Sequence, residues 1–231
     1  HIVRHNAAHR TLAPLGARPL QPSQNPGIFQ AERARRLLGH WVRALNGRSL
    51  YRKASFLLDQ LGKQLFPPKV QRDERPHLTG GLGSAPFDNE GVATRARDIV
   101  QQGILQSYVL DSYAARRLDM QPTGNAGGVH NLFISHDEVD FNDLCRHMGT
   151  GLVVTEVMGQ GINIVTGDYS RGASGFWVEN GEIQNPVEEI TLASTLQEIF
   201  KGVQAIADDV DMRSNICSGS WLVDNMTVAG E

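Results

Sequence analysis

The strongest constraint on the fold comes from Gly175–Ile183, where Asn180-Gly181 separates two short apolar runs. A two-residue type I′ turn needs positive φ at both central positions, and Asn-Gly meets that need at low cost. The segment therefore predicts a β-hairpin. Other strand-like runs also occur in adjacent pairs, with helices between them and no regular β-α alternation. We therefore expect an α+β fold with largely antiparallel sheets and interspersed helices.

Two segments carry the periodicity of helices. Apolar residues recur at helical spacing from Leu37 to Leu45, which predicts a helix over about Ala31–Leu45 that ends at Asn46-Gly47. A second helical pattern covers Phe56–Leu65 and stops at two prolines.

The start of the chain is a short amphipathic pattern over residues 1–12, followed by a proline-rich run from Pro14 to Pro26 that we expect to be an extended connector. The chain begins with His1 and not Met, which suggests that it starts inside a longer protein. No stretch approaches the roughly 18 apolar residues of a membrane helix. Two cysteines form no disulfide framework and fit a reducing compartment, so we expect a cytoplasmic protein.

The overall charge argues against nucleic acid as a direct ligand. The formal net charge is -3, and the short arginine-rich stretches are interleaved with carboxylates or apolar residues. Proteins that bind nucleic acid usually carry a basic excess, because phosphate contacts dominate their affinity.

Neither metal binding nor nucleophilic catalysis has a local motif. The eight histidines and two cysteines match no common zinc spacing, and no Gly-x-Ser-x-Gly sequence occurs. Cys217 precedes a predicted strand, where a buried inert thiol is the more frequent case than a reactive one.

The glycine-punctuated stretch from Met158 to Ala173 has two interpretations. It could expose backbone groups that bind an extended peptide by strand addition, or it could be a twisted strand pair with bulges at its glycines. Asp168 and Arg171 could also pair with each other. The residues selected for peptide or interface contact are Gly159, Gly161, Asp168, Tyr169 and Arg171.

This stretch and several other segments resemble the PmbA (TldE) branch of the TldD/PmbA family, and the resemblance covers nearly the whole chain. The matching segments are residues 51–59, 86–92, 122–128, 149–161, 166–173, 175–183 and 213–216. The resemblance implies that residues 1–231 are the family's central and C-terminal region, and that its N-terminal domain is absent.

The resemblance also implies an activity. TldD-type members carry a His-Glu-x-x-x-His zinc motif on a helix, with a cysteine near the C-terminus as third ligand. They pair with PmbA-type subunits in a peptidase that degrades unfolded peptides, and the family is also named for modulation of DNA gyrase. By this resemblance the expected partners are a TldD-type subunit, or a second copy of the chain, and extended peptides.

The motif positions hold the wrong residue types for zinc. If Leu45-Asn46-Gly47 corresponds to the Leu-Glu-Gly that follows the motif in TldD-type members, the motif positions fall at Leu38, Gly39 and Arg43. A one-residue slip puts His40 at the Glu position but supplies no histidine pair. Cys217 falls close to the third-ligand position, and one thiolate rarely holds zinc. We therefore expect no cofactor in this chain, with zinc only in the partner.

Three functions remain open from the sequence. The first is a non-catalytic subunit of a TldD/PmbA-type metalloprotease complex. The second is an independent peptidase that uses Cys217 with a distant histidine such as His40. The third is an interaction protein that modulates gyrase without proteolysis.

Overall fold

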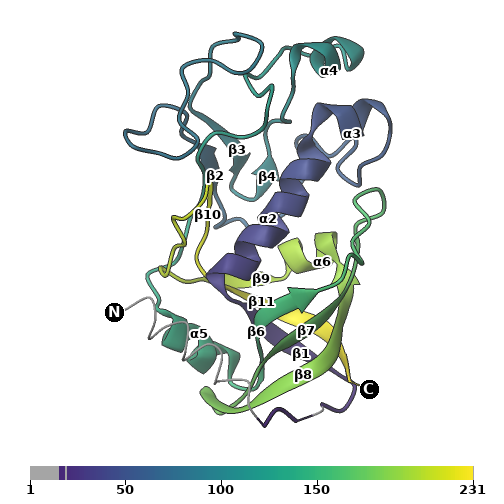
Figure 1. The fold of residues 1–231 in the computed structure, drawn as a ribbon, viewed down its shortest axis with the longest axis vertical. Coiled ribbons are helices and arrows are strands. Elements are labelled where there is room, and N and C mark those ends of the chain that lie inside the picture. Colours follow the sequence, from purple (N-terminus) through teal and green to yellow (C-terminus); the bar gives the residue numbers. More distant parts are fainter. Residues whose placement is uncertain (1–15, 19, 231) are drawn as a thin grey trace.

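The computed structural model describes residues 16–18 and 20–230, which form two sheets joined by one long helix (Figure 1). The larger, six-stranded sheet closes on itself, because β1 pairs in parallel with β6 and antiparallel with β11. Its strands, in spatial order, are β1 (Ser23–Phe29), β6 (Gly151–Met158), β7 (Asp168–Glu179), β8 (Glu182–Thr195), β11 (Trp221–Gly230) and β9 (Val203–Ile206).

The smaller sheet has five short strands. Its spatial order is β10 (Ile216–Cys217), β5 (Leu132–Ile134), β2 (Arg72–Glu74), β3 (Arg97–Gln101) and β4 (Ile104–Leu105). The β10–β5 pair is parallel and the other pairs are antiparallel. The two sheets together confirm the predicted α+β class with largely antiparallel pairing.

Helix α2 lies between the two sheets (Figure 1). Its buried face carries Trp41 and Leu45, which belong to the same core cluster as Val100 of the smaller sheet and Trp221 of the larger sheet. In the described residues no helix is long and apolar enough to cross a membrane. The helices are α2 (Ala31–Leu45), α3 (Gly47–Tyr51), α4 (Ser112–Arg117), α5 (Phe141–Met148) and α6 (Leu196–Lys201).

Two sequence predictions are confirmed in detail. The helix predicted over Ala31–Leu45 has those bounds. Strands β7 and β8 form the predicted hairpin, with Asn180 at φ 53° and Gly181 at φ 80°. The turn chemistry and the apolar periodicity therefore fixed both elements locally.

The helix predicted over Phe56–Leu65 is wrong, because this segment is a series of turns. Its backbone groups bond elsewhere: the N–H groups of Leu65 and Phe66 both donate to the Gly103 carbonyl, in the turn between β3 and β4. Gly62 lies at φ 74°, which interrupts any helix. Tertiary pairing thus overrides the local pattern.

The extended connector predicted for the proline-rich run ends in a strand that the sequence did not predict. β1 contains Pro26, and its register against β11 shifts between Asn25 and Gly27. A proline is tolerated at such an irregularity because it has no N–H to donate. The amphipathic pattern over residues 1–12 lies outside the described residues.

Candidate functional site: an arginine-lined hollow on α2

The polar face of α2 lines an open hollow of about 580 Å³. Arg36, His40 and Arg43 lie at spacings of four and three, so they share one helix face opposite the buried leucines. Arg171 of β7 joins them from the larger sheet. The complete lining is Arg35, Arg36, Gly39, His40, Arg43, Arg171, Arg213, Ser214 and Ile216.

Carboxylates neutralise part of this hollow. Arg35 lies 3.2 Å from Asp211, and the Nε of Arg213 lies 2.8 Å from the same carboxylate. Arg213 also pairs with Glu32. Burial alone would raise the pKa of Asp211, but the side-chain and backbone hydrogen bonds from Arg213 and the charges of Arg35 and Arg213 hold it below its usual value.

Within the described part of the chain, three arginines of the hollow have no carboxylate partner. Arg36 and Arg43 are exposed and make no ion pair with any residue in the part of the chain that the structure describes. Arg171 donates from Nε to the Met158 carbonyl at 2.8 Å, and its Nη2 donates more weakly to the Val157 carbonyl at 3.4 Å. The hollow therefore carries an excess of positive charge.

His40 responds to this charge. Burial, followed by the charges of Arg43, Arg171 and Arg36, lowers the pKa of His40 to about 4. Its Nδ1 atom is buried, with no hydrogen-bond partner among the described residues. His40 is therefore a neutral imidazole at pH 7.

This shift predicts a pH dependence of stability. The unfolded chain protonates His40 near pH 6.5 and the folded chain only near pH 4. The contribution of neutral His40 to the free energy of unfolding is therefore fully present above pH 6.5 and is lost as the pH falls toward 4. Because His40 is only half-buried, we discount the shift for solvent screening and expect a loss of about 1 kcal/mol between pH 7 and pH 5. Urea unfolding of the native protein and His40→Gln at both pH values measures it. Equal pH slopes for the two proteins would contradict the assignment.

The four residues that the resemblance assigns to the zinc motif and the third-ligand position do not gather at one point. Leu38 is fully buried in the core, while Gly39 and Arg43 line the hollow. Cys217 is buried at 3 % exposure, and its thiol contacts the Ser214 carbonyl at 3.3 Å. Burial and the nearby Asp211 carboxylate raise the pKa of Cys217, which disfavours the thiolate.

These residues do not fit a metal ion. Neither Leu38 nor Gly39 has a donor atom in its side chain, and Arg43 repels a cation. Among residues 16–18 and 20–230, no three His, Cys, Asp or Glu side chains are placed to hold a metal ion together.

The residues selected for peptide contact lie in different surroundings. Tyr169 is buried at 3 % exposure and packs edge-on against Phe29, and burial raises the pKa of Tyr169 to about 12. Asp168 is exposed on the other face of β7 and bonds to Thr166, so it makes no pair with Arg171. The two glycines precede β7, and Arg171 alone of the five lines the hollow.

Strand β6 offers an unpaired edge beside the hollow. Its pairing with β1 stops at Val154, whereas its pairing with β7 continues to Met158. Between Thr155 and Met158, no described strand covers the other side. Arg171 bonds to the carbonyls at the end of this edge, and Arg33 bonds to the Thr155 carbonyl at its start.

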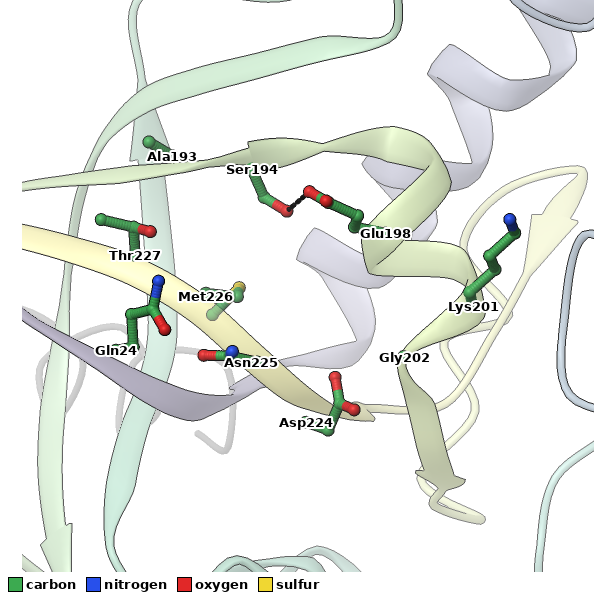
Figure 2. A pocket seen from close by; sticks show the side chains of 10 residues that line it. All are labelled: Gln24, Ala193, Ser194, Glu198, Lys201, Gly202, Asp224, Asn225, Met226 and Thr227. Atoms are coloured by element: carbon green, nitrogen blue, oxygen red, sulfur yellow. Dashed lines mark hydrogen bonds between the residues drawn. The ribbon is translucent and has the colours of Figure 1, made fainter.

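In two other hollows the lining carboxylates serve local structure. One of about 410 Å³ lies between β8, α6 and β11 (Figure 2). Its Glu198 bonds to Ser194 and forms a capping box with Thr195, so this carboxylate stabilises the start of α6. The other, of about 430 Å³, contains Asp209, which holds the N–H and hydroxyl groups of Ser220.

Comparison with known proteins decides the family. Residues 22–230 match the family model described as the PmbA/TldA metallopeptidase C-terminal domain. The chain belongs to the PmbA/TldD family. It is 51 % identical to Metalloprotease PmbA of Escherichia coli O157:H7, over 98 % of the chain and 50 % of that protein. It is 52 % identical to a PmbA homolog of Haemophilus influenzae, over 99 % of the chain and 51 % of that protein.

Solved structures of the PmbA/TldD type share this fold. A candidate modulator of DNA gyrase from Bacteroides thetaiotaomicron superposes with a TM-score of 0.94 at 30 % identity, over 98 % of this chain and 52 % of that one. TldE from Thermococcus kodakarensis superposes with a TM-score of 0.85 at 20 % identity, over 98 % and 55 %. The chain thus spans about half the length of the relatives it matches.

Sequence reasoning identified Arg43 and Arg171 separately but not the hollow they share. Arg35 and Arg36 belong to one of the short arginine-rich stretches that argued against nucleic acid as a ligand. The available signal was the spacing of Arg36, His40 and Arg43 on the polar face of a helix. The approach of β7 to that face required the structure.

Proposed function

We propose that this chain is the non-catalytic, PmbA/TldE-type part of a cytoplasmic metalloprotease complex that degrades or processes unfolded peptides. A TldD-type partner supplies the zinc, and this chain helps to hold the substrate. The observation that carries the proposal is the arginine-lined hollow, whose charge repels cations, beside Leu38, Gly39 and Arg43. The resemblance assigns the metal motif to these three positions, and none of them supplies a zinc ligand.

The unpaired edge of β6 supports the peptide-holding role. An extended chain can bind such an edge through main-chain hydrogen bonds, which tolerate many side-chain sequences. The edge at Thr155–Met158 lies beside the hollow, because Arg171 contacts both. A bound peptide would therefore pass directly from the strand edge to the arginines.

The alternative of a thiol peptidase built on Cys217 has little support. A nucleophilic cysteine needs an accessible thiol with a lowered pKa. Cys217 is buried and its pKa is raised. His40, the candidate base, faces the hollow from α2 beside three cationic groups. Modulation of gyrase without proteolysis is the other alternative, and it predicts no peptide cleavage in the following experiment.

The test is reconstitution. The full-length protein is mixed with its TldD-type counterpart, and cleavage of an unstructured fluorogenic peptide is followed. We expect cleavage only when both proteins are present and zinc is available, and loss of cleavage when the histidines of the counterpart are replaced. Cleavage by this protein alone, unaffected by chelators and blocked by thiol reagents, would support the Cys217 alternative. Absence of cleavage by the mixture would contradict the proposal.

A further inference from the structure

The excess positive charge of the hollow on α2 has no role in the fold that the contacts explain. Arg36 and Arg43 are exposed, lie on the same helix face and pair with no carboxylate among residues 16–18 and 20–230. Arg171 donates two hydrogen bonds to β6 carbonyls, and its side chain also lines the hollow. Like charges held together cost free energy unless an anion joins them.

We propose that this hollow binds a carboxylate of the peptide substrate, held by the guanidinium groups of Arg43 and Arg171 with Arg36 beside them. The inference rests on the proposed function, because it names the chemical feature of the peptide that the site recognises. Nothing in it requires that this chain cleave the peptide.

The chemistry of the lining favours a carboxylate. A guanidinium presents planar, paired N–H donors that match the two oxygens of a carboxylate, and such charge-assisted pairs are the strong hydrogen bonds of proteins. The fields of the same three arginines converge on His40, whose pKa they lower together with burial. The neutral imidazole limits the total charge while leaving the arginines free to bind an anion.

The position of the hollow favours a carboxylate that belongs to a peptide. Arg171 bonds to Met158 and Val157 at the end of the unpaired β6 edge. A peptide that paired along Thr155–Met158 would displace arginine side chains from the carbonyls it needs. It would then present either its C-terminal carboxylate or an acidic side chain to the arginines. A hollow of about 580 Å³ also leaves room for the side chain of the terminal residue.

Binding of matched peptides to the full-length protein tests the proposal. Fluorescence anisotropy would compare one unstructured neutral peptide as the free acid and as the C-terminal amide. Two further peptides, both amidated at the C-terminus, would differ only at one internal position, which is Glu in one and Gln in the other. We expect at least one carboxylate form to bind about 10- to 100-fold more tightly than its neutral counterpart. Preference for the free acid assigns the site to the C-terminus, and preference for Glu assigns it to an acidic side chain.

Variants separate the hollow from general charge. We expect Arg43→Gln and Arg171→Gln to abolish most of the carboxylate preference. Arg116→Gln removes an equal charge from the exposed side of α4 and should leave the preference intact. Urea unfolding would establish that each variant is folded, and because Arg43 is exposed, its replacement should preserve the fold.

Three results would overturn the carboxylate site. They are equal binding of charged and neutral peptides, equal loss of preference in Arg43→Gln and Arg116→Gln, or tighter binding of a short oligonucleotide that Arg43→Gln abolishes. The assay contains no TldD-type protein and measures no cleavage. Its failure is therefore distinct from failure of the proposed function, which the reconstitution experiment tests.

Discussion

Replacement of Arg97 by methionine is expected to lower the free energy of unfolding by about 3–5 kcal/mol. Its Nε donates at 2.9 Å to Glu74, which is 2 % exposed. The other Glu74 oxygen accepts from the Asn125 side chain at 2.8 Å and from the His130 N–H at 2.6 Å. Without Arg97, two neutral donors would have to stabilise a buried carboxylate, which costs far more than loss of an exposed ion pair.

The matched control is Arg48→Met. Arg48 lies 3.2 Å from Asp111, but its side chain is 71 % exposed. Exposed pairs contribute at most about 1 kcal/mol, so this variant should unfold close to the native protein. Urea unfolding of both variants measures the difference. Equal effects would show that burial of Glu74 does not set the cost.

Replacement of Arg72 by alanine should lower the free energy of unfolding by about 2–5 kcal/mol. Arg72 is fully buried, and its guanidinium lies 3.7 Å from the ring centroid of Phe66 and 4.3 Å from that of Trp41. It is also within 6 Å of the Phe200 and Trp221 rings. Alanine would leave a cavity among these rings.

Arg72→Met separates packing from charge. No described residue hydrogen-bonds to the Arg72 guanidinium, and burial lowers the pKa of Arg72 well below its usual value. The cost of desolvation, several kcal/mol per ion, opposes cation–π attraction of about 2 kcal/mol for each close ring. We therefore expect methionine, which fills similar space, to change stability by less than about 1 kcal/mol. A loss as large as that of alanine would show that the cation–π contacts dominate.

Local chemistry made much of the fold predictable. The Asn180-Gly181 turn and the apolar face of α2 each lie within one segment, so the sequence alone was sufficient. The helix prediction for Phe56–Leu65 was wrong because the backbone N–H groups at the end of this segment donate to the Gly103 carbonyl, about 40 residues later in the chain. Strand β1 was missed because Pro26 is a poor strand signal, and only its bulge makes it compatible with pairing.

The site was predictable only in parts. The resemblance supplied the motif positions, and the residue types there argued against zinc. The convergence of Arg171 on Arg43 depends on the packing of β7 near α2, which no local pattern encodes. The burial of Tyr169 was also missed. This residue of a glycine-rich stretch lies in the core because alternate residues of β7 point inward.

The zinc content of the purified full-length protein tests most directly the claim that this chain supplies no metal site. Elemental analysis would compare the native protein with Cys217→Ala, after dialysis against buffer with trace zinc. Less than about 0.1 equivalent of zinc in both is the predicted result. A genuine site would keep its metal through dialysis, because a protein zinc site that folds with its metal holds it tightly. Zinc near one equivalent, lost in Cys217→Ala, would contradict the account and make this chain a metallopeptidase in its own right.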